Sequence, residues 1–393
     1  MARVSQRLGR LPGSATLAIS NRAREMRAEG RDIISFGAGE PDFPTPDHIV
    51  AAAQTAAGID ANHHYSANAG LATLRDAITG YTRTYSDVEV DPATVLVTNG
   101  AKQAIFQAFA ALLDPGDEAL LPAPHWVTYP AGIELAGAAA ISVPTRMEDG
   151  FKVTPDQLEA ARTDRTKLLV FVSPSNPTGA VYSADEARAI GEWAVANHVW
   201  VIADEIYQRL VYGDDEAAPS IAAVTPGLED VLLVNGVAKS FAMTGWRVGW
   251  MIGPPDVIGA AARHQSHATG NVNNIAQVAA LEAITGPQDT VLAMREAFNK
   301  RRQTMVSMLA EAEGVDCYEP DGAFYVFPSV ERLLGDRYPT SAALAEGLLE
   351  EAGIAVVPGE SFGAPGFLRL SYALSDADLE RGVARMLSMF ESL

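Results

Sequence analysis

Five short runs of almost wholly apolar residues recur through the middle of the chain and constrain its fold more than any other feature. They lie at residues 95–98, 118–121, 168–172, 199–203 and 231–234. Strands that are buried on both faces have this composition, because neither side of the sheet meets water. Helical patterns separate most of the runs, so we expect a mostly parallel sheet that is covered on both sides.

Two of the intervening segments carry clear helical signals. Residues 101–113 place apolar side chains on one face, and the Asp-Pro-Gly sequence at 114–116 stops the pattern. The second segment starts with Ser-Ala-Asp-Glu at 183–186, in which the serine and glutamate are spaced as a capping box. That helix is predicted to run to about residue 197.

The last part of the chain has a less regular pattern. The predicted elements are a long helix at about 290–311, a strand at 323–327, a helix at 341–352, short strands at 354–357 and 367–371, and a final helix. We therefore expect an α/β protein with a large domain at about 47–290. The N-terminal residues 1–46 and residues 291–393 are predicted to form a smaller α+β domain.

Charged and polar residues directly follow two of the predicted strands, where α/β proteins place their active sites. Lys239 follows the run at 231–234 within an apolar, glycine-rich stretch, although lysines are normally exposed. Asp204 follows the run at 199–203, and Tyr207 lies about one helical turn later. Taken singly, such a lysine is most often solvated and such an acid often caps a helix.

Three further features suit an anion or a ligand oxygen. Arg247 lies eight positions after Lys239, and its guanidinium suits a phosphate group. A separate cation of this kind is needed if Lys239 forms an imine with a ligand, because the lysine can then no longer neutralise the phosphate. The segment 98–102 joins a strand to a helix, and free N–H groups at a helix start bind phosphate. The loop at 172–179 holds two prolines and Asn176, so it can present an amide rigidly.

In their order along the chain, these segments resemble those of fold-type I pyridoxal-phosphate (PLP) enzymes, and specifically class I aminotransferases close to bacterial aspartate aminotransferases. The segment from Lys239 to Gly249 matches the family's cofactor-attachment pattern at every defined position. The resemblance extends from Ser35 to Tyr372. It implies a large αβα domain, PLP as cofactor, and ping-pong transfer of an amino group between an L-amino acid and a 2-oxo acid.

The resemblance also implies roles for individual residues. Lys239 holds the cofactor as a Schiff base and moves the substrate proton, while Asp204 pairs with the pyridine nitrogen. The other implied cofactor contacts are Tyr207, Asn176, Trp126, Arg247, the backbone amides of Ala101 and Lys102, and Tyr65 of the neighbouring subunit. The contribution of Tyr65 implies a homodimer with shared active sites. The implied substrate site consists of Arg369, which binds the α-carboxylate, with Gly39, Asn176, Trp126 and Lys102.

Substrate choice is less constrained than cofactor binding. Lys102, Ser14 and Thr16 resemble residues that bind the distal carboxylate of a dicarboxylic substrate, which favours aspartate and 2-oxoglutarate. Residues 11–14 lack a lysine that is common in relatives, which weakens both the dicarboxylate interpretation and the expectation of activity on prephenate. A separate departure concerns the cofactor: Gly236 stands where many relatives have a phosphate-binding serine, so one phosphate hydroxyl is missing. The same PLP core also serves aminotransferases for aromatic or aliphatic amino acids or prephenate, carbon–sulfur lyases, and PLP-sensing regulators.

Composition narrows the partners and the setting. The formal net charge is −20, which disfavours nucleic acid and anionic membranes as partners and argues against a DNA-binding regulator. Cys317 is the only cysteine, so no disulfide can form within the chain, and no Cys/His cluster has zinc-ligand spacing. We expect a cytoplasmic enzyme that has no metal, signal peptide or membrane span.

Overall fold

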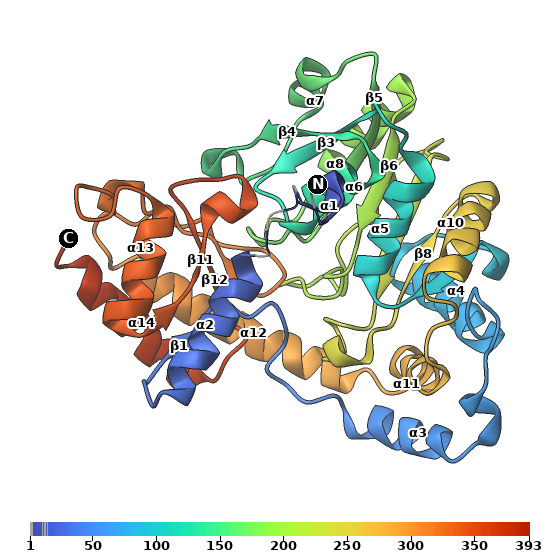
Figure 1. Ribbon diagram of the computed structural model, residues 1–393, viewed down its shortest axis with the longest axis horizontal. Helices are drawn as coiled ribbons and strands as arrows, with labels where there is room; N and C mark the ends of the chain where they lie inside the picture. Colours follow the sequence, from blue (N-terminus) through green and yellow to red (C-terminus); the bar gives the residue numbers. More distant parts are fainter. Residues whose placement is uncertain (1–2, 10, 12, 14) are drawn as a thin grey trace.

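A seven-stranded sheet forms the centre of the computed structural model, which describes residues 3–9, 11, 13 and 15–393 (Figure 1). The strand order is β2-β8-β7-β6-β5-β3-β4, and only β8 runs antiparallel to its neighbours. The strands are β2 (Val95–Thr98), β3 (Glu118–Ala123), β4 (Ala139–Pro144), β5 (Thr166–Val172), β6 (Trp200–Asp204), β7 (Val231–Gly236) and β8 (Gly249–Ile252). The mostly parallel α/β sheet expected from the apolar runs is confirmed.

Helices cover both faces of this sheet, because successive strand residues point to opposite sides. One face packs against α5 (Ala101–Leu112), α6 (Thr128–Ala136) and α10 (Pro255–Ala268). The other face packs against α3 (Asp47–Ala57), α4 (Ala72–Ser86), α8 (Ala184–Asn197) and α11 (Asn274–Thr285), with α7 (Pro155–Ala161) and α9 (Ile221–Val224) at its margin. Ser183 and Glu186 form the predicted capping box of α8.

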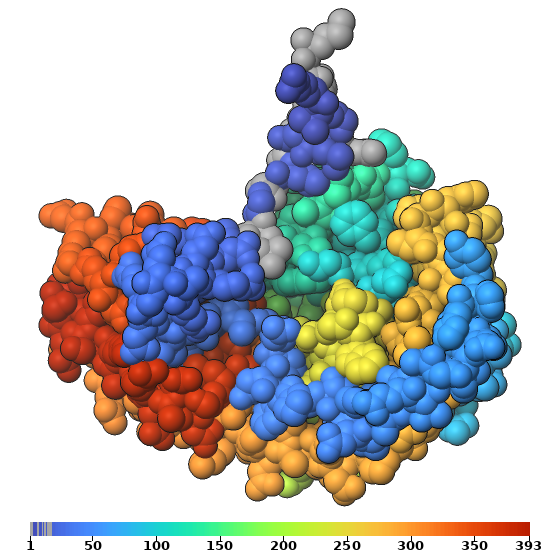
Figure 2. All heavy atoms as spheres, turned by 60° about the horizontal axis from the view of Figure 1, so that its bottom comes forward, coloured from blue at the N-terminus to red at the C-terminus, as the bar shows by residue number. Residues whose placement is uncertain are grey.

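A smaller part of the molecule combines the start of the chain with its last hundred residues. Figure 1 shows the blue helix α2 beside the orange and red C-terminal elements. These elements are α2 (Ala15–Ala28), β1 (Ile34–Ser35), α12 (Asp289–Leu309), β9 (Tyr325–Val326), α13 (Ser341–Gly347), β10 (Ile354–Ala355), β11 (Val357–Pro358), β12 (Leu368–Ser371) and α14 (Asp376–Phe390). The short helix α1 (Gln6–Gly9) does not belong to this group and projects away from it in Figure 2. β1 pairs with β10, and β11, β12 and β9 form an antiparallel sheet.

Two predicted strands of this smaller part were wrong in extent, whereas one predicted helix has the expected extent but changes in type along its length. The strand predicted at 323–327 is only Tyr325–Val326, because Ala323 has a φ of +58°, which an extended strand excludes. The strand predicted at 354–357 is two strands, β10 and β11, in different sheets. The helix predicted at 341–352 is α-helical to Gly347 and continues as a π-helical turn over Leu348–Ala352.

The parallel strands end at one edge of the large sheet, and the smaller part packs against the segments that follow them. Tyr207 and Ala238 come from these segments and share one apolar cluster with Phe324 and Tyr325. Figure 2 shows a hollow in the surface between the blue helix α2 and the teal and yellow residues of the part that contains the large sheet. Within the described ranges, no helix has the length and apolar character needed to cross a membrane.

Candidate active site

Lys239 lies in the connection between β7 and β8, beyond the carboxyl end of β7. The two strands are paired up to Gly236 and Gly249, and a side chain on Gly249 would collide with the backbone nitrogen of Ala101. The Lys239 ammonium donates a hydrogen bond to the carbonyl oxygen of Gly39. Burial, and then the charge of Arg369, lowers the pKa of Lys239 to about 8. The amine can therefore lose its proton near neutral pH, as a nucleophilic lysine must.

Asp204 ends β6 and is only 3% exposed. Its Oδ2 accepts a hydrogen bond from the Tyr129 hydroxyl at 2.7 Å, and its Oδ1 accepts one from the Ile206 N–H at 3.2 Å. Burial raises the pKa of Asp204, and the Tyr129 hydrogen bond opposes that shift. Both described partners are neutral, so a cationic ligand group would stabilise this carboxylate strongly.

Tyr207 is buried in the turn after β6, and its hydroxyl oxygen lies 2.9 Å from that of Tyr325 in β9. The two rings pack edge to face with centroids 5.9 Å apart. Burial, followed by interaction with Tyr325, raises the pKa of Tyr207 well above its usual value, so its hydroxyl keeps its proton. Sequence reasoning missed Tyr325, because its apolar neighbours indicated only a core strand.

The start of α5 and Arg247 form a place for an anion. No side chain of the described residues caps this helix, and Gly100 at the N-cap position has a φ of +81°. The first N–H groups of the helix are therefore open to a ligand. The Arg247 guanidinium donates to the carbonyl oxygens of Thr244 at 3.0 Å and Asn99 at 3.3 Å. Arg247 itself has a φ of +56°, a strained conformation that aims its side chain and is common at functional sites.

Arg369 forms a second place for an anion. Its side chain lies on β12, is 2% exposed, and donates to Oδ1 of Asn176 at 3.0 Å and to the Gly37 carbonyl at 2.9 Å. Its Nε has no hydrogen-bond partner in the described part of the chain. A buried guanidinium with uncharged partners is well suited to a carboxylate, which would take up its unused donors.

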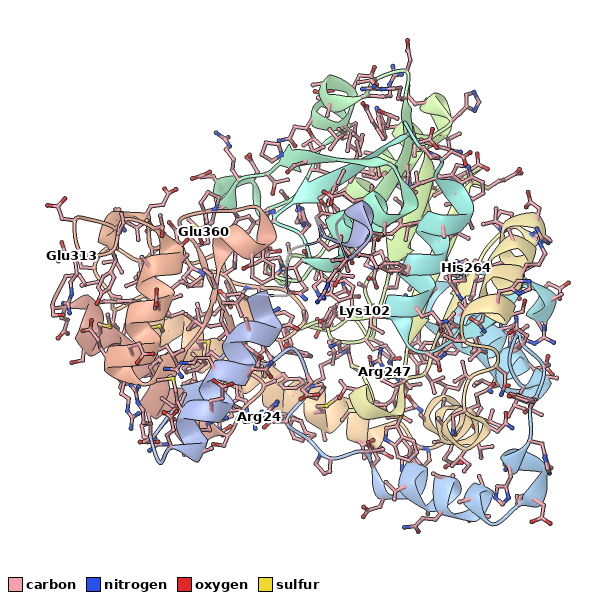
Figure 3. All side chains as sticks on the ribbon, viewed as in Figure 1. Arg24, Lys102, Arg247, His264, Glu313 and Glu360 are labelled. Atoms are coloured by element: carbon pink, nitrogen blue, oxygen red, sulfur yellow. The ribbon has the colours of Figure 1, made fainter. Side chains whose placement is uncertain are left out.

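Lys102 and Trp126 line the same region. The exposed Lys102 ammonium lies 4.9 Å from the centre of the Trp126 ring. Figure 3 shows Lys102 close to Arg247, whose charge contributes, after burial, to lowering the pKa of Lys102. Trp126 packs edge to face with Tyr129, which in turn bonds Asp204. Tyr129 was not predicted, although its position three residues after Trp126 was an available signal.

The remaining predicted residues are Tyr65, Gly39, Ser14 and Thr16, and of those that the structure describes only Gly39 contacts the groups described above. The Tyr65 side chain is 97% exposed, as expected if it serves a neighbouring subunit, and that role stays a prediction. Gly39 bonds Lys239, whereas the nearby Gly37 bonds Arg369. Ser14 and the side chain of Thr16 lie outside the described residues. In the parts of the chain that the structure covers, no three potential metal-ligating side chains gather.

The family described as aminotransferase class I and II matches residues 31–386 of this sequence. This chain belongs to that family. The aminotransferase is 56% identical over 390 residues to an aspartate aminotransferase of Streptomyces avermitilis, covering 98% of this chain and 95% of the relative. The resemblance found in the sequence and the assignment as an aminotransferase are thereby confirmed.

Two further relatives of the aminotransferase bear on its fold and substrate. It is 47% identical over 396 residues to an aspartate/prephenate aminotransferase of Cereibacter sphaeroides, with 98% of both chains covered. It superposes on the solved structure of aspartate aminotransferase from Thermus thermophilus with maleate at a TM-score of 0.93 and 40% identity. That match covers 99% of this chain and 100% of the other, so the whole fold is shared.

Proposed function

We propose that this aminotransferase uses PLP and that Lys239 binds the cofactor covalently. The observation that carries the proposal is the arrangement of charges at one edge of the sheet. Arg247 and the uncapped start of α5 suit a phosphate, and the buried Asp204 suits a protonated pyridine nitrogen. Tyr207 offers a hydroxyl to the ring oxygen. When bound, PLP supplies an electron sink that makes the α-hydrogen of an amino acid acidic.

The surroundings of Lys239 suit it to carry protons. With a pKa of about 8, its amine can take up the α-proton of the substrate and return it at neutral pH. Arg369, steadied by Asn176 and the Gly37 carbonyl, fixes the substrate carboxylate. Arg369 is close enough to Lys239 to help lower its pKa, so a carboxylate bound there lies near the proton carrier. Asp204 holds positive charge on the ring nitrogen.

L-aspartate is the amino donor and 2-oxoglutarate the acceptor in this proposal. Relatives named aspartate aminotransferase at 56% and 43% identity support that choice. Lys102 supplies a second cation, beside Trp126, for a distal carboxylate. Prephenate is a second candidate acceptor, because a relative at 47% identity is named for both substrates. Turnover with prephenate and aspartate, measured against turnover with 2-oxoglutarate, distinguishes the two.

The proposal includes a homodimer with shared sites in the cytoplasm. Tyr65 is a large aromatic residue that is almost fully exposed, which is typical of an interface. Arg247 lines an open depression into which such a side chain of a second copy could reach. The other residues that line it are Thr45, Asn99, Ala242, Gly245, Trp246, Asn273, Ile275 and Ala276. We also propose the division into a domain at 47–290 and a second one built from 1–46 and 291–393.

An absorption spectrum of the purified protein with PLP tests the cofactor and the donor together. We expect the band of the lysine-bound cofactor, and we expect L-aspartate alone to convert it to the spectrum of the aminated cofactor. Lys239→Ala removes the first band, whereas Lys300→Ala, at an exposed lysine paired with Asp376, keeps it. A band that ignores aspartate refutes the donor. The absence of any lysine-dependent band refutes the cofactor assignment.

A further inference from the structure

Tyr325 contacts two groups to which the proposed function gives separate tasks. Its hydroxyl oxygen lies 2.9 Å from that of Tyr207, which faces the cofactor in the proposal. Its ring centre lies 4.4 Å from the guanidinium carbon of Arg369, which binds the substrate carboxylate in the proposal. Tyr325 is fully buried, so both contacts are made in a water-poor environment where they are strong.

Both parts of the molecule hold the backbone around Tyr325 in place. Tyr325 pairs with Ser371 of β12, the strand that carries Arg369. Just before it, the Ala323 N–H donates to the Leu210 carbonyl at 2.8 Å, and Leu210 lies one turn after Tyr207. These pairings fix the backbone position from which the Tyr325 side chain reaches both contacts.

The direction of the hydrogen bond between the two tyrosines follows from the number of protons. Each tyrosine hydroxyl has one proton to donate. If Tyr207 donates its proton to the ring oxygen of the cofactor, only Tyr325 can donate in the bond between them. Hydrogen bonds in such chains strengthen one another, so donation from Tyr325 makes Tyr207 a better donor. Tyr325 would then stabilise negative charge on the ring oxygen without touching it.

The ring of Tyr325 acts on Arg369 by a different interaction. A guanidinium within about 6 Å of an aromatic ring centre is attracted by the negative face of the ring. The Phe362 ring lies 5.1 Å from the same guanidinium, and the hydrogen-bond partners of Arg369 are uncharged. Loss of the Tyr325 ring would leave Arg369 freer to turn away from a carboxylate.

We propose that Tyr325 is a positioning residue that couples the substrate-carboxylate site at Arg369 to the protonation of the bound cofactor through Tyr207. This inference rests on the proposed function, because that function defines both ends of the coupling. It assigns the hydroxyl and the ring of one side chain to separate tasks. The two tasks can be separated by substitution.

Two variants and a matched control test the proposal. Tyr325→Phe removes the hydroxyl and keeps the ring, and Tyr325→Leu removes both. Tyr372→Phe is the control, because Tyr372 is also fully buried but bonds the Tyr212 hydroxyl at 3.0 Å and the Ala323 carbonyl. The two measurements are the pH midpoint of the spectral change of the bound cofactor and the dissociation constant of maleate, a dicarboxylate that carries no amino group.

Each substitution has its own expected pattern. We expect Tyr325→Phe to raise the pH midpoint by about 0.5 unit or more, because a donor to the ring oxygen favours loss of the proton. Maleate affinity changes less than about twofold in that variant, because the ring contact remains. Tyr325→Leu shifts the midpoint similarly and weakens maleate binding by about fivefold or more. Tyr372→Phe leaves both quantities at the wild-type values.

The coupling is overturned if Tyr325→Phe titrates like Tyr372→Phe, or if Tyr325→Leu binds maleate as tightly as the wild type. Circular dichroism checks the fold, and Tyr325→Met replaces the leucine variant if that variant does not fold. If the wild-type protein shows no lysine-dependent cofactor band, the cofactor assignment itself is wrong. That outcome refutes the proposed function and is distinguishable from a failure of the coupling.

Discussion

Replacement of Gly100 by alanine tests the anion site with a single carbon atom. An added Cβ would lie 2.7 Å from the Arg247 Nη2 and 3.0 Å from its guanidinium carbon. Because these atoms end a flexible side chain, the guanidinium would move aside and the fold would persist. Arg247 is the cation that we assign to the cofactor phosphate. The substitution therefore displaces that cation without deleting it.

Gly100→Ala is expected to lower two quantities, the folding stability of the protein and its affinity for PLP. At a φ of +81° and a ψ of 164°, Gly100 occupies a region that is essentially restricted to glycine, and alanine there costs on the order of 1–3 kcal/mol of stability. A charged hydrogen bond from Arg247 to the phosphate contributes about 1.5–3 kcal/mol. Its loss weakens PLP binding by roughly 10–150-fold.

The assay is a titration of cofactor-free protein with PLP, alongside thermal unfolding of the free protein. Gly116→Ala is the matched control, since Gly116 has a φ of +103° but an added Cβ meets no atom of the residues that the structure describes within 4 Å. Gly116 lies before β3, at the opposite edge of the sheet from Lys239. Both variants are expected to lose thermal stability, and only Gly100→Ala to lose PLP affinity. Equal PLP affinity in the two variants would refute the assignment of Arg247.

Three other expectations concern the charged groups of the site. Arg369→Lys loses the planar guanidinium that can bind a carboxylate through two hydrogen bonds, so kcat/KM for aspartate falls about 10–100-fold. Arg302→Lys, at a buried arginine bonded to Glu319, serves as the control. Unchanged kinetics for the Arg369 variant would contradict its role. Asp204→Asn keeps the shape of the side chain but removes its negative charge, so kcat falls by about 10–100-fold or more while PLP still binds. A near-normal kcat would count against Asp204 as the partner of the ring nitrogen. Only the neutral Lys239 amine can attach PLP, so with a pKa of about 8 the attachment rate rises about tenfold from about pH 7 to about pH 9 and then levels off. A rate that kept rising toward pH 10 would mean that the pKa of Lys239 is not lowered.

Five of the seven strands of the large sheet could be predicted from the sequence because their mostly apolar runs are buried within the sheet. The edge strand β4 was not predicted, since most of its residues are exposed or half-buried. β8 was missed as a strand because it begins at Gly249, the last residue of the segment that resembles the attachment motif, and no turn signal separates the strand from that segment. The small strands are harder, because they are only two to four residues long. The left-handed backbone of Ala323 illustrates the reason, since nothing in its local sequence marks that conformation.

The site could be predicted only where a residue follows a strand or belongs to a motif. Lys239, Asp204 and Arg247 met that condition, and the structure brings their segments to one edge of the sheet. Tyr129 and Tyr325 did not, because their hydroxyls meet Asp204 and Tyr207 only through contacts between distant parts of the chain. A tyrosine inside an apolar stretch has the same sequence pattern whether its hydroxyl is structural or functional.

The buried charges of Asp204 and Arg369, whose protein partners are uncharged, also affect how long each molecule survives. A ligand that neutralises such groups binds the folded chain only, and at about 100 times its dissociation constant it adds about 2.7 kcal/mol to the free energy of unfolding. Molecules without PLP would then open more often and reach proteases sooner. We therefore expect vitamin supply to set the abundance of this protein in the cell, and a half-life unaffected by PLP starvation would contradict that link.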